Sequence, residues 1–384
     1  MRADLREEFE LPRDVCYLKA AYMTPQPKRV LQAAVRGAEN RARAWLITPG
    51  DFFHEIESLR RSFATLLACS SENIAIVPSA SYGIATAANN TALGPRESVM
   101  VLADQFPSNY YSWQRLAEKT GGEVSVVTKQ DQQNWSSSIL EHVRSRPGQI
   151  RAAALANHHW ATGEPIDLVA VCDELHKLGT QIVLDLTQTV GACPIDVVGL
   201  DPDFAVIAGY KWLFCPYGVS FLYVADRHLD GTPLEETWAG RSGSEDFSQL
   251  ATYTDQYQAG ARRFDMGQRA SFSNITAAVE AIEMVREWGV GNISNSLHDV
   301  NIRISGIFAE HGFETPDPKD RAPHMQSVRR PNVGTREIAT RLAEHKVFVS
   351  QRGDRLRIAP HLYTDAADLV KLHDTLGLVM RDNA

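Results

Sequence analysis

Short apolar runs without polar alternation recur along the first 224 residues of the chain. They lie at residues 74–77, 98–102, 124–127, 152–155, 182–185, 204–207 and 219–224. Such runs are typical of strands that are buried on both faces of a sheet. The segments between them, such as 167–179, have helical periodicity and several end in glycine. The pattern predicts an α/β fold with a mostly parallel, doubly wound sheet.

The pattern changes after residue 270. A helical run at 275–288 is followed by Gly289 and Gly291, and then by helices and short strands with polar spacers. A chain of 384 residues also exceeds the size at which a single core keeps growing. We therefore predict a large domain at 46–288 and a smaller α/β C-terminal domain at 289–384. The stretch 317–331 combines several prolines with charges, which predicts an exposed loop.

Composition narrows the possible functions. Hydrophobic residues at 44% and charged residues at 22% are ordinary for a soluble globular protein, and no apolar run approaches the roughly 18 residues of a membrane helix. The first residues alternate in charge where a signal peptide needs an apolar stretch, so we expect a cytoplasmic protein without a membrane partner. A net charge of −8 without a basic face disfavours nucleic acid. Five scattered cysteines without a CxxC pair predict neither disulfides nor a metal site.

Two charged residues follow strand-like runs and suggest a cofactor. Asp185 ends the run at 182–185, and Lys211 comes shortly after the run at 204–207. Ligands of doubly wound sheets bind beyond the carboxyl ends of the strands, where both residues are expected. A lysine that loses its proton readily can form a Schiff base with an aldehyde. A carboxylate can keep a pyridine nitrogen protonated, so the pair indicates pyridoxal phosphate (PLP).

The segment 78–88 follows the first core strand and leads directly into a helix. Free backbone N–H groups and the positive end of the helix dipole can bind phosphate there, with the hydroxyls of Ser79 and Ser81 as further donors. The chain contains neither GxGxxG nor GxxxxGK[ST], which gives no support to a dinucleotide or a P-loop nucleotide.

These residues resemble a known group of proteins, the class V aminotransferase family of fold-type I PLP enzymes. The family includes cysteine desulfurases, kynureninase, isopenicillin N epimerase-like proteins and carbon–sulfur lyases of ergothioneine pathways. The resemblance is strongest in the sequence IVLDLTQ at 182–188 and in AGYKW at 208–212. It implies that Asp185 faces the pyridine nitrogen, Gln188 contacts the phenolic oxygen of the cofactor, and Lys211 is the Schiff-base lysine.

The resemblance also implies roles for other positions. Ser81, with the backbone around Ala80 and Tyr82, matches the phosphate-binding turn, and Tyr210 matches a further phosphate contact. Phe106 aligns with the aromatic residue that stacks on the cofactor ring, and Trp160 with the substrate side of that ring. Adjacent histidines at 158 and 159 point to opposite faces of an extended strand, which disfavours a shared metal ion. Arg357 matches the arginine that binds the substrate carboxylate, a task that suits the two parallel donors of a guanidinium. Arg352 and Arg355 are weaker candidates.

Further expectations concern the N-terminal segment and a second subunit. Residues 1–45 are expected to cover the active site and to pack on the small domain, with Tyr22 facing substrate. The stretch 266–274 resembles a segment that reaches the phosphate of the partner subunit, so Gln268 is a predicted contributor. The resemblance thus implies a homodimer with composite active sites.

The family carries out several reactions on α-amino acids, and all of them share a carbanion at Cα. Expulsion of a β-sulfur group makes a lyase, reprotonation on the cofactor makes an aminotransferase, and reprotonation at Cα makes an epimerase. The loop 347–355 lacks the reactive cysteine of desulfurases, which argues against persulfide-forming desulfuration. Because the motifs most resemble those of ergothioneine-pathway lyases and epimerases, we favour β-elimination of the carbon–sulfur lyase type. A nicotinamide-dependent oxidoreductase and a catalytically silent PLP-binding protein are the alternatives outside these reactions.

Overall fold

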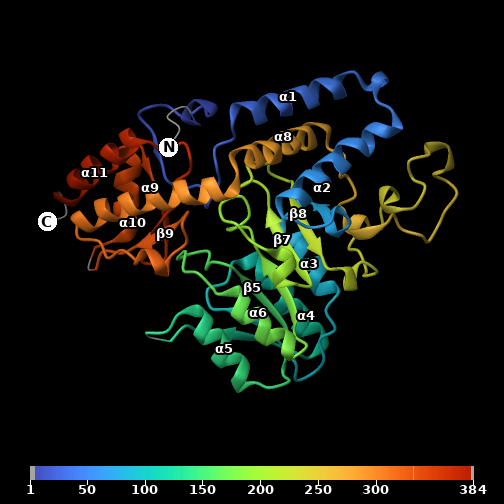
Figure 1. Cartoon of the computed structure of the whole chain (residues 1–384), viewed down its shortest axis with the longest axis horizontal. Helices are drawn as coiled ribbons and strands as arrows, with labels where there is room; N and C mark the ends of the chain where they lie inside the picture. Colours follow the sequence, from blue (N-terminus) through green and yellow to red (C-terminus); the bar gives the residue numbers. More distant parts are fainter. Residues whose placement is uncertain (1–4, 131, 332, 382–384) are drawn as a thin grey trace.

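A seven-stranded sheet forms the centre of the molecule in a computed structural model that describes residues 5–130, 132–331 and 333–381. The strand order is β2-β8-β7-β6-β5-β3-β4. Strands β8, β7 and β5 are labelled in Figure 1. The strands are β2 (Ile74–Val77), β3 (Ser98–Leu102), β4 (Glu123–Val127), β5 (Ile150–Ala156), β6 (Gln181–Asp185), β7 (Phe204–Ala208) and β8 (Ser220–Val224). Only β8 runs against its neighbours, so the predicted mostly parallel α/β sheet is confirmed.

Alternate residues of each strand enter two different hydrophobic cores. On β6, Ile182 and Leu184 belong to one core and Val183 to the other. The first core is closed by helices α2 (His54–Leu66), α5 (Trp135–Ser145), α6 (Leu168–Lys177) and α8 (Phe272–Trp288). The second core is closed by α3 (Ala80–Asn89) and α4 (Tyr111–Thr120). Burial on both faces explains why the strands read as continuous apolar runs.

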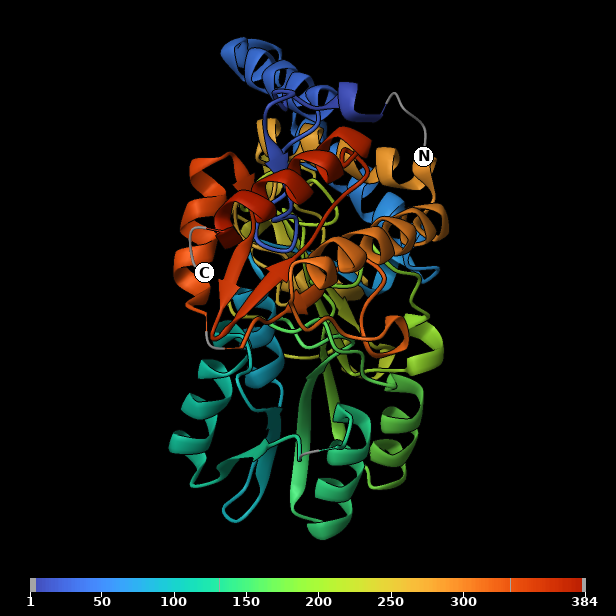
Figure 2. The same ribbon diagram turned by 90° about the vertical axis from the view of Figure 1, so that its left-hand side faces the viewer.

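A smaller layer contains the C-terminal part of the chain and packs around a third core. Its three-stranded sheet has the order β11-β12-β9, with strands β11 (Ser350–Arg352), β12 (Arg355–Ile358) and β9 (Gln326–Val328). Helices α9 (Val290–Glu310), α10 (Thr335–Glu344) and α11 (Ala366–Arg381) complete it, and they lie in front in Figure 2. The domain limits at residues 45 and 288 stay a prediction.

Gly289 separates α8 from α9 and has a φ of 75°, which allows the chain to turn between the two helices. The prediction of an exposed loop at 317–331 is wrong for residues 321–328, most of which are buried. Residues Gln326–Val328 form β9 and are buried, because they pair with β12 in a register that the local sequence does not reveal.

The N-terminal segment joins the two layers. Strand β1 (Cys16–Tyr17) pairs with β10 (Val347–Phe348), and Cys16 and Leu18 enter the third core. Helix α1 (Lys28–Ala42) then packs along α8 (Figure 1). Gly37 permits this approach, since a Cβ at that position would lie 2.4 Å from the carbonyl oxygen of Phe272.

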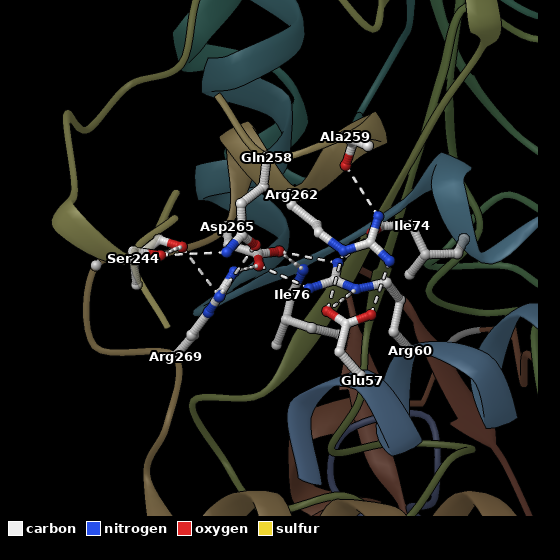
Figure 3. Close-up of polar contacts among 12 residues, drawn as sticks. Glu57, Arg60, Ile74, Ile76, Ser244, Gln258, Ala259, Arg262, Asp265 and Arg269 are labelled. Carbon is white, nitrogen blue, oxygen red and sulfur yellow. Dashed lines mark hydrogen bonds and ion pairs between the residues drawn. The ribbon is translucent and has the colours of Figure 1, made fainter. Parts of the chain in front are cut away.

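A buried ionic cluster anchors β2 to the segment before α8 (Figure 3). The Asp265 carboxylate accepts hydrogen bonds from Arg60 at 2.7 Å, from the Ile76 backbone N–H at 2.7 Å, and from Arg269. All three side chains are at most 2% exposed. Because β2 leads directly to the turn before α3, the cluster fixes one wall of the site described below.

Candidate active site

Asp185 and Lys211 lie together at the carboxyl ends of neighbouring strands. Asp185 is the last residue of β6, and Lys211 comes just after β7, which pairs with β6 in parallel. Both side chains line one cavity and are 9% and 7% exposed. The parallel pairing therefore brings together two residues that are 26 positions apart in sequence.

Burial lowers the pKa of Lys211 to about 8, because a desolvated ammonium is less stable than a neutral amine. The Asp185 carboxylate acts in the opposite direction, and the charges of Arg357 and Arg352 lower the value further. The ammonium nitrogen lies 5.5 Å from the ring centroid of Phe106 and 5.7 Å from that of Tyr210. At pH 7 about a tenth of Lys211 is thus neutral, a far larger share than for a solvated lysine.

Burial raises the pKa of Asp185, whereas hydrogen bonds from Thr187 and the charge of Lys211 lower it. The Thr187 N–H donates to Asp185 Oδ1 at 3.1 Å. The hydroxyl oxygen of Thr187 accepts a hydrogen bond from the Ala208 N–H at 3.0 Å, which connects the ends of β6 and β7. This one side chain fixes the distance between the strand ends that carry Asp185 and Lys211.

The turn before α3 forms the other end of the cavity. Ser79 caps the helix, its hydroxyl accepting a hydrogen bond from the Tyr82 N–H at 3.1 Å and lying 2.8 Å from the Ser81 hydroxyl. The N–H groups of Ala80 and Ser81 have no acceptor within the helix because they belong to its first turn. Those two groups face an anion-binding position, but the N–H of Tyr82 is already used by Ser79.

Aromatic side chains form the walls between these two ends. Phe106 and Trp160 line the cavity, and their ring centroids lie 5.3 Å apart in an edge-to-face arrangement. The indole N–H of Trp160 donates to the Asp104 carbonyl at 2.6 Å, which fixes the ring. Tyr210 and Tyr217 also line the cavity, with a centroid distance of 4.7 Å.

Two hydrogen bonds connect the N-terminal segment to residues of the site. The Thr24 hydroxyl donates to the Lys211 carbonyl at 2.7 Å, and the Gln188 amide donates to the Ala21 carbonyl at 3.0 Å. Gln188 also accepts a bond from the indole N–H of Trp212 at 2.8 Å, so its amide orientation is fixed. Tyr22 is 53% exposed beside this segment and does not line the cavity.

Arg357 projects from β12 and is 1% exposed. One of its terminal nitrogens donates to the Trp160 carbonyl at 2.7 Å, while Nε and Nη2 have no partner in the described chain. A buried guanidinium with unused donors suits a carboxylate ligand. Gln268 is not brought to this site, because it lines a second cavity with Arg41, Trp238 and Phe272.

Comparison with known proteins places the chain in a family. The family model for class V aminotransferases matches residues 16–366. The chain belongs to the class V aminotransferase family. Among its curated relatives, kynureninase of Deinococcus radiodurans is 29% identical over 358 residues, which cover 85% of this chain and 82% of the relative.

Solved structures of low sequence identity share the fold of this class V protein. The apo structure of a cysteine desulfurase from Thermococcus onnurineus NA1 has a TM-score of 0.84 at 18% identity, covering 99% of this chain and 98% of that one. A complex of the cystine C–S lyase C-DES with its product cysteine persulfide has a TM-score of 0.82 at 16% identity, covering 94% and 97%. The predicted fold-type I architecture is confirmed.

The cavity of this class V enzyme fits its family cofactor, PLP. A buried, partly neutral amine and a buried carboxylate stand at one end, and a helix N-terminus with unused N–H groups at the other. A protonated pyridine nitrogen facing Asp185 would give that desolvated carboxylate the opposite charge that stabilises it. Among the described residues, no group of His, Cys, Asp and Glu is arranged to bind a metal ion.

Residues of the cavity that the sequence analysis left without a role include His158, Thr187 and Tyr217. Burial lowers the pKa of His158 to about 4, so its ring is neutral. Its position two residues before Trp160 was visible in the sequence, but only the fold shows that it lines the cavity. Within the described ranges, no helix is long and apolar enough to cross a bilayer.

Proposed function

We propose that the protein catalyses β-elimination from α-amino acids that carry a sulfur leaving group on Cβ. The observation that carries this proposal is a cavity that contains an amine of lowered pKa and, among the described residues that line it, no thiol. Lys211 has a pKa of about 8 there, and no cysteine is found among the described residues that line the cavity. Burial raises the pKa of all five cysteines, with that of Cys69 at about 11, so none is a ready nucleophile.

The residues divide the work as follows. Arg357 binds the α-carboxylate of the substrate and fixes its orientation through its unused donors. The amine of Lys211 removes the Cα proton and holds it at Nζ, which a pKa of about 8 permits. Bound PLP supplies the electron sink for the charge that develops at Cα. Gln188 and Asp185 orient the cofactor ring, and Ser79, Ala80 and Ser81 hold its phosphate.

A leaving group on Cβ departs in the next step, since the electron pair of the broken Cα–H bond forms the Cα–Cβ double bond. The thiolate that leaves takes up a proton, and the aminoacrylate that remains hydrolyses to pyruvate and ammonia. The structural likeness to a cystine C–S lyase supports this outcome. The relatives of the chain also include a kynureninase and an isopenicillin N epimerase. Transamination and epimerisation are therefore included in the test.

We also propose a homodimer whose second subunit completes the phosphate site through Gln268. Gln268 lies away from Lys211 within one chain but borders an open cavity beside Trp238, which is 43% exposed. Trp45 and Leu46, which follow α1 in the sequence, are 79% and 64% exposed. A second copy of the chain would cover these apolar side chains. Light scattering of the holoenzyme gives the mass directly, and a monomer contradicts the proposal.

The reaction is tested with purified holoenzyme and a panel of cysteine S-conjugates. Pyruvate and ammonia release, amino transfer to a keto acid, and loss of optical purity are followed in parallel. We expect pyruvate and ammonia in equal amounts, abolished in Lys211→Ala and retained in the control Lys177→Ala, whose lysine is exposed on α6. Amino transfer or racemisation without pyruvate contradicts the elimination, and unchanged PLP binding and turnover in Lys211→Ala contradicts the role of Lys211.

A further inference from the structure

One face of the hairpin β11–β12 carries a concentration of hydrogen-bond donors. The register pairs Ser350 with Arg357 and Arg352 with Arg355 across the two strands. Directly opposite residues of an antiparallel pair point to the same face, and residues two apart on one strand do so as well. The side chains of Ser350, Arg352, Arg355 and Arg357 therefore share a face.

Several donors on this face have no partner in the described part of the chain. They are Nε and Nη2 of Arg357, Nε of Arg352 and the hydroxyl of Ser350, all of which are buried. Ser350 and Arg357 are 4% and 1% exposed. A buried polar group without a hydrogen bond costs on the order of 1–3 kcal/mol, and more if it is charged. So many unused donors at one place indicate a ligand with several acceptor oxygens.

The positive charge here exceeds what one carboxylate neutralises. The guanidinium carbons of Arg352 and Arg357 lie 5.3 Å and 5.7 Å from the ring centroid of the same indole, that of Trp160. Lys19 adds a third cation, because its backbone bridges to Ala359 at the end of β12. None of the three cations has an ion pair with an acidic residue of the described ranges.

Burial lowers the pKa of two of these cations, and repulsion from their neighbours adds to the effect. Burial and, to a smaller extent, the charge of Arg352 together lower the pKa of Arg357 to about 9. Burial likewise lowers the pKa of Lys19, with additional effects from Arg352 and Arg357. The cofactor phosphate is an unsuitable counter-ion, because its expected site is the turn before α3. Neither arginine is among the residues that line the cavity; both lie beside it, next to the ring of Trp160.

We propose that the substrate carries a second anionic group on its side chain, and that Arg352 binds this group while Arg357 binds the α-carboxylate. Within the proposed function, this assigns the substrate class: an acidic amino acid whose thiol leaving group bears a carboxylate or a related oxyanion. The ring of Trp160 lies within cation–π distance of both guanidiniums. Ser350 supplies a neutral donor next to Arg357.

Binding is measured first, with ligands that cannot react. Calorimetric titration of the holoenzyme compares succinate with succinamate, which has the same shape and one carboxylate fewer. We expect succinate to bind at least tenfold more tightly. In Arg352→Gln the ratio of the two affinities should fall to about one, with the affinity for succinamate unchanged. Arg352→Lys should retain part of the preference for succinate. Arg303→Gln, which removes an exposed charge from α9, serves as the control with an unchanged preference.

Turnover is then compared for S-carboxymethyl-L-cysteine and its neutral analogue S-carbamoylmethyl-L-cysteine. We expect the charged substrate to have the higher kcat/KM, with the difference residing in KM and lost in Arg352→Gln. Equal binding of succinate and succinamate by the wild-type holoenzyme overturns the inference. The inference is also overturned if Arg352→Gln weakens the binding of both ligands equally while its far-UV circular dichroism is unchanged. Failure of the proposed function looks different: the diacid preference persists, but no S-conjugate yields pyruvate.

Discussion

The ionic cluster around Asp265 leads to a quantitative prediction about stability. Asp265→Asn keeps the side-chain volume but removes the charge that faces Arg60 and Arg269, whose side chains are 0% and 2% exposed. Arg60 keeps a bond to Glu57 at 3.1 Å, whereas Arg269 keeps only the Ala239 carbonyl at 3.0 Å and a long contact to Gln258. Leaving a buried charge without its partner costs about 3–5 kcal/mol. We expect a loss of that size in the free energy of unfolding.

Urea denaturation followed by tryptophan fluorescence measures this loss, at constant protein and PLP concentration. Glu236→Gln is the matched control, because it breaks an ion pair with Arg241 whose side chains are 59% and 27% exposed. That variant should lose less than about 1 kcal/mol. A loss below about 1 kcal/mol in Asp265→Asn, with the same denaturant dependence as the wild type, would refute the reasoning.

Asp265→Asn should also weaken PLP binding, because the Asp265 carboxylate holds the Ile76 N–H at 2.7 Å in the strand that leads to Ser79. Cofactor affinity is measured by equilibrium titration of the apoprotein under conditions where the variant is fully folded. Unchanged affinity would mean that the turn before α3 keeps its geometry without the cluster.

Three further predictions concern acid–base behaviour and backbone geometry. In the apoprotein the pKa of Lys211 is about 8, so the rate of PLP incorporation should rise with pH around that value, and Arg352→Gln should move the midpoint upward by removing a positive neighbour. Asp203 has a pKa lowered to about 2 from 3.8, since hydrogen bonds from His228 and Arg227 outweigh the effect of burial. The contribution of ionised Asp203 to folding stability is present above pH 3.8 and is lost as pH falls toward 2. Urea titrations should therefore show Asp203→Asn to be about 2 kcal/mol less stable than the wild type at pH 6, with the difference disappearing in acid. Gly191→Ala should lose more stability, and more bound PLP, than the control Gly179→Ala; both have positive φ, but only at Gly191 does a Cβ meet the Trp212 carbonyl oxygen, at 2.5 Å. Equal losses of stability and bound PLP in the two glycine variants would show that the backbone at Trp212, next to Lys211, can move to accommodate the added methyl group.

The strands of the central sheet were predictable because their signal is local. Runs such as 98–102 and 204–207 are apolar on both faces, and the observed strands Ser98–Leu102 and Phe204–Ala208 agree with them within one residue. Strand β9 was missed because it is short, lies among prolines, and is specified by pairing with β12 rather than by its own sequence.

The sequence by itself determined where the two candidate catalytic residues lie. Asp185 and Lys211 follow buried strands, and parallel strands end at the same edge of a sheet, so their meeting in one cavity follows from topology. Local signals also identified the turn at Ser79, since a serine before a helix caps its first turn.

Only the tertiary structure decided which of the remaining charges and hydrogen-bond donors lie together and which of them are free to bind a ligand. The Tyr82 N–H donates its hydrogen bond to the Ser79 hydroxyl and is therefore not free for an anion. Gln268 and Lys211 line different cavities within one chain. Arg352 and Arg357 share a face because of the register between β11 and β12, and they share an indole because β12 packs against the loop that carries Trp160. Register and packing are properties of long-range contacts, and the free energy that selects them is spread over residues far apart in the chain.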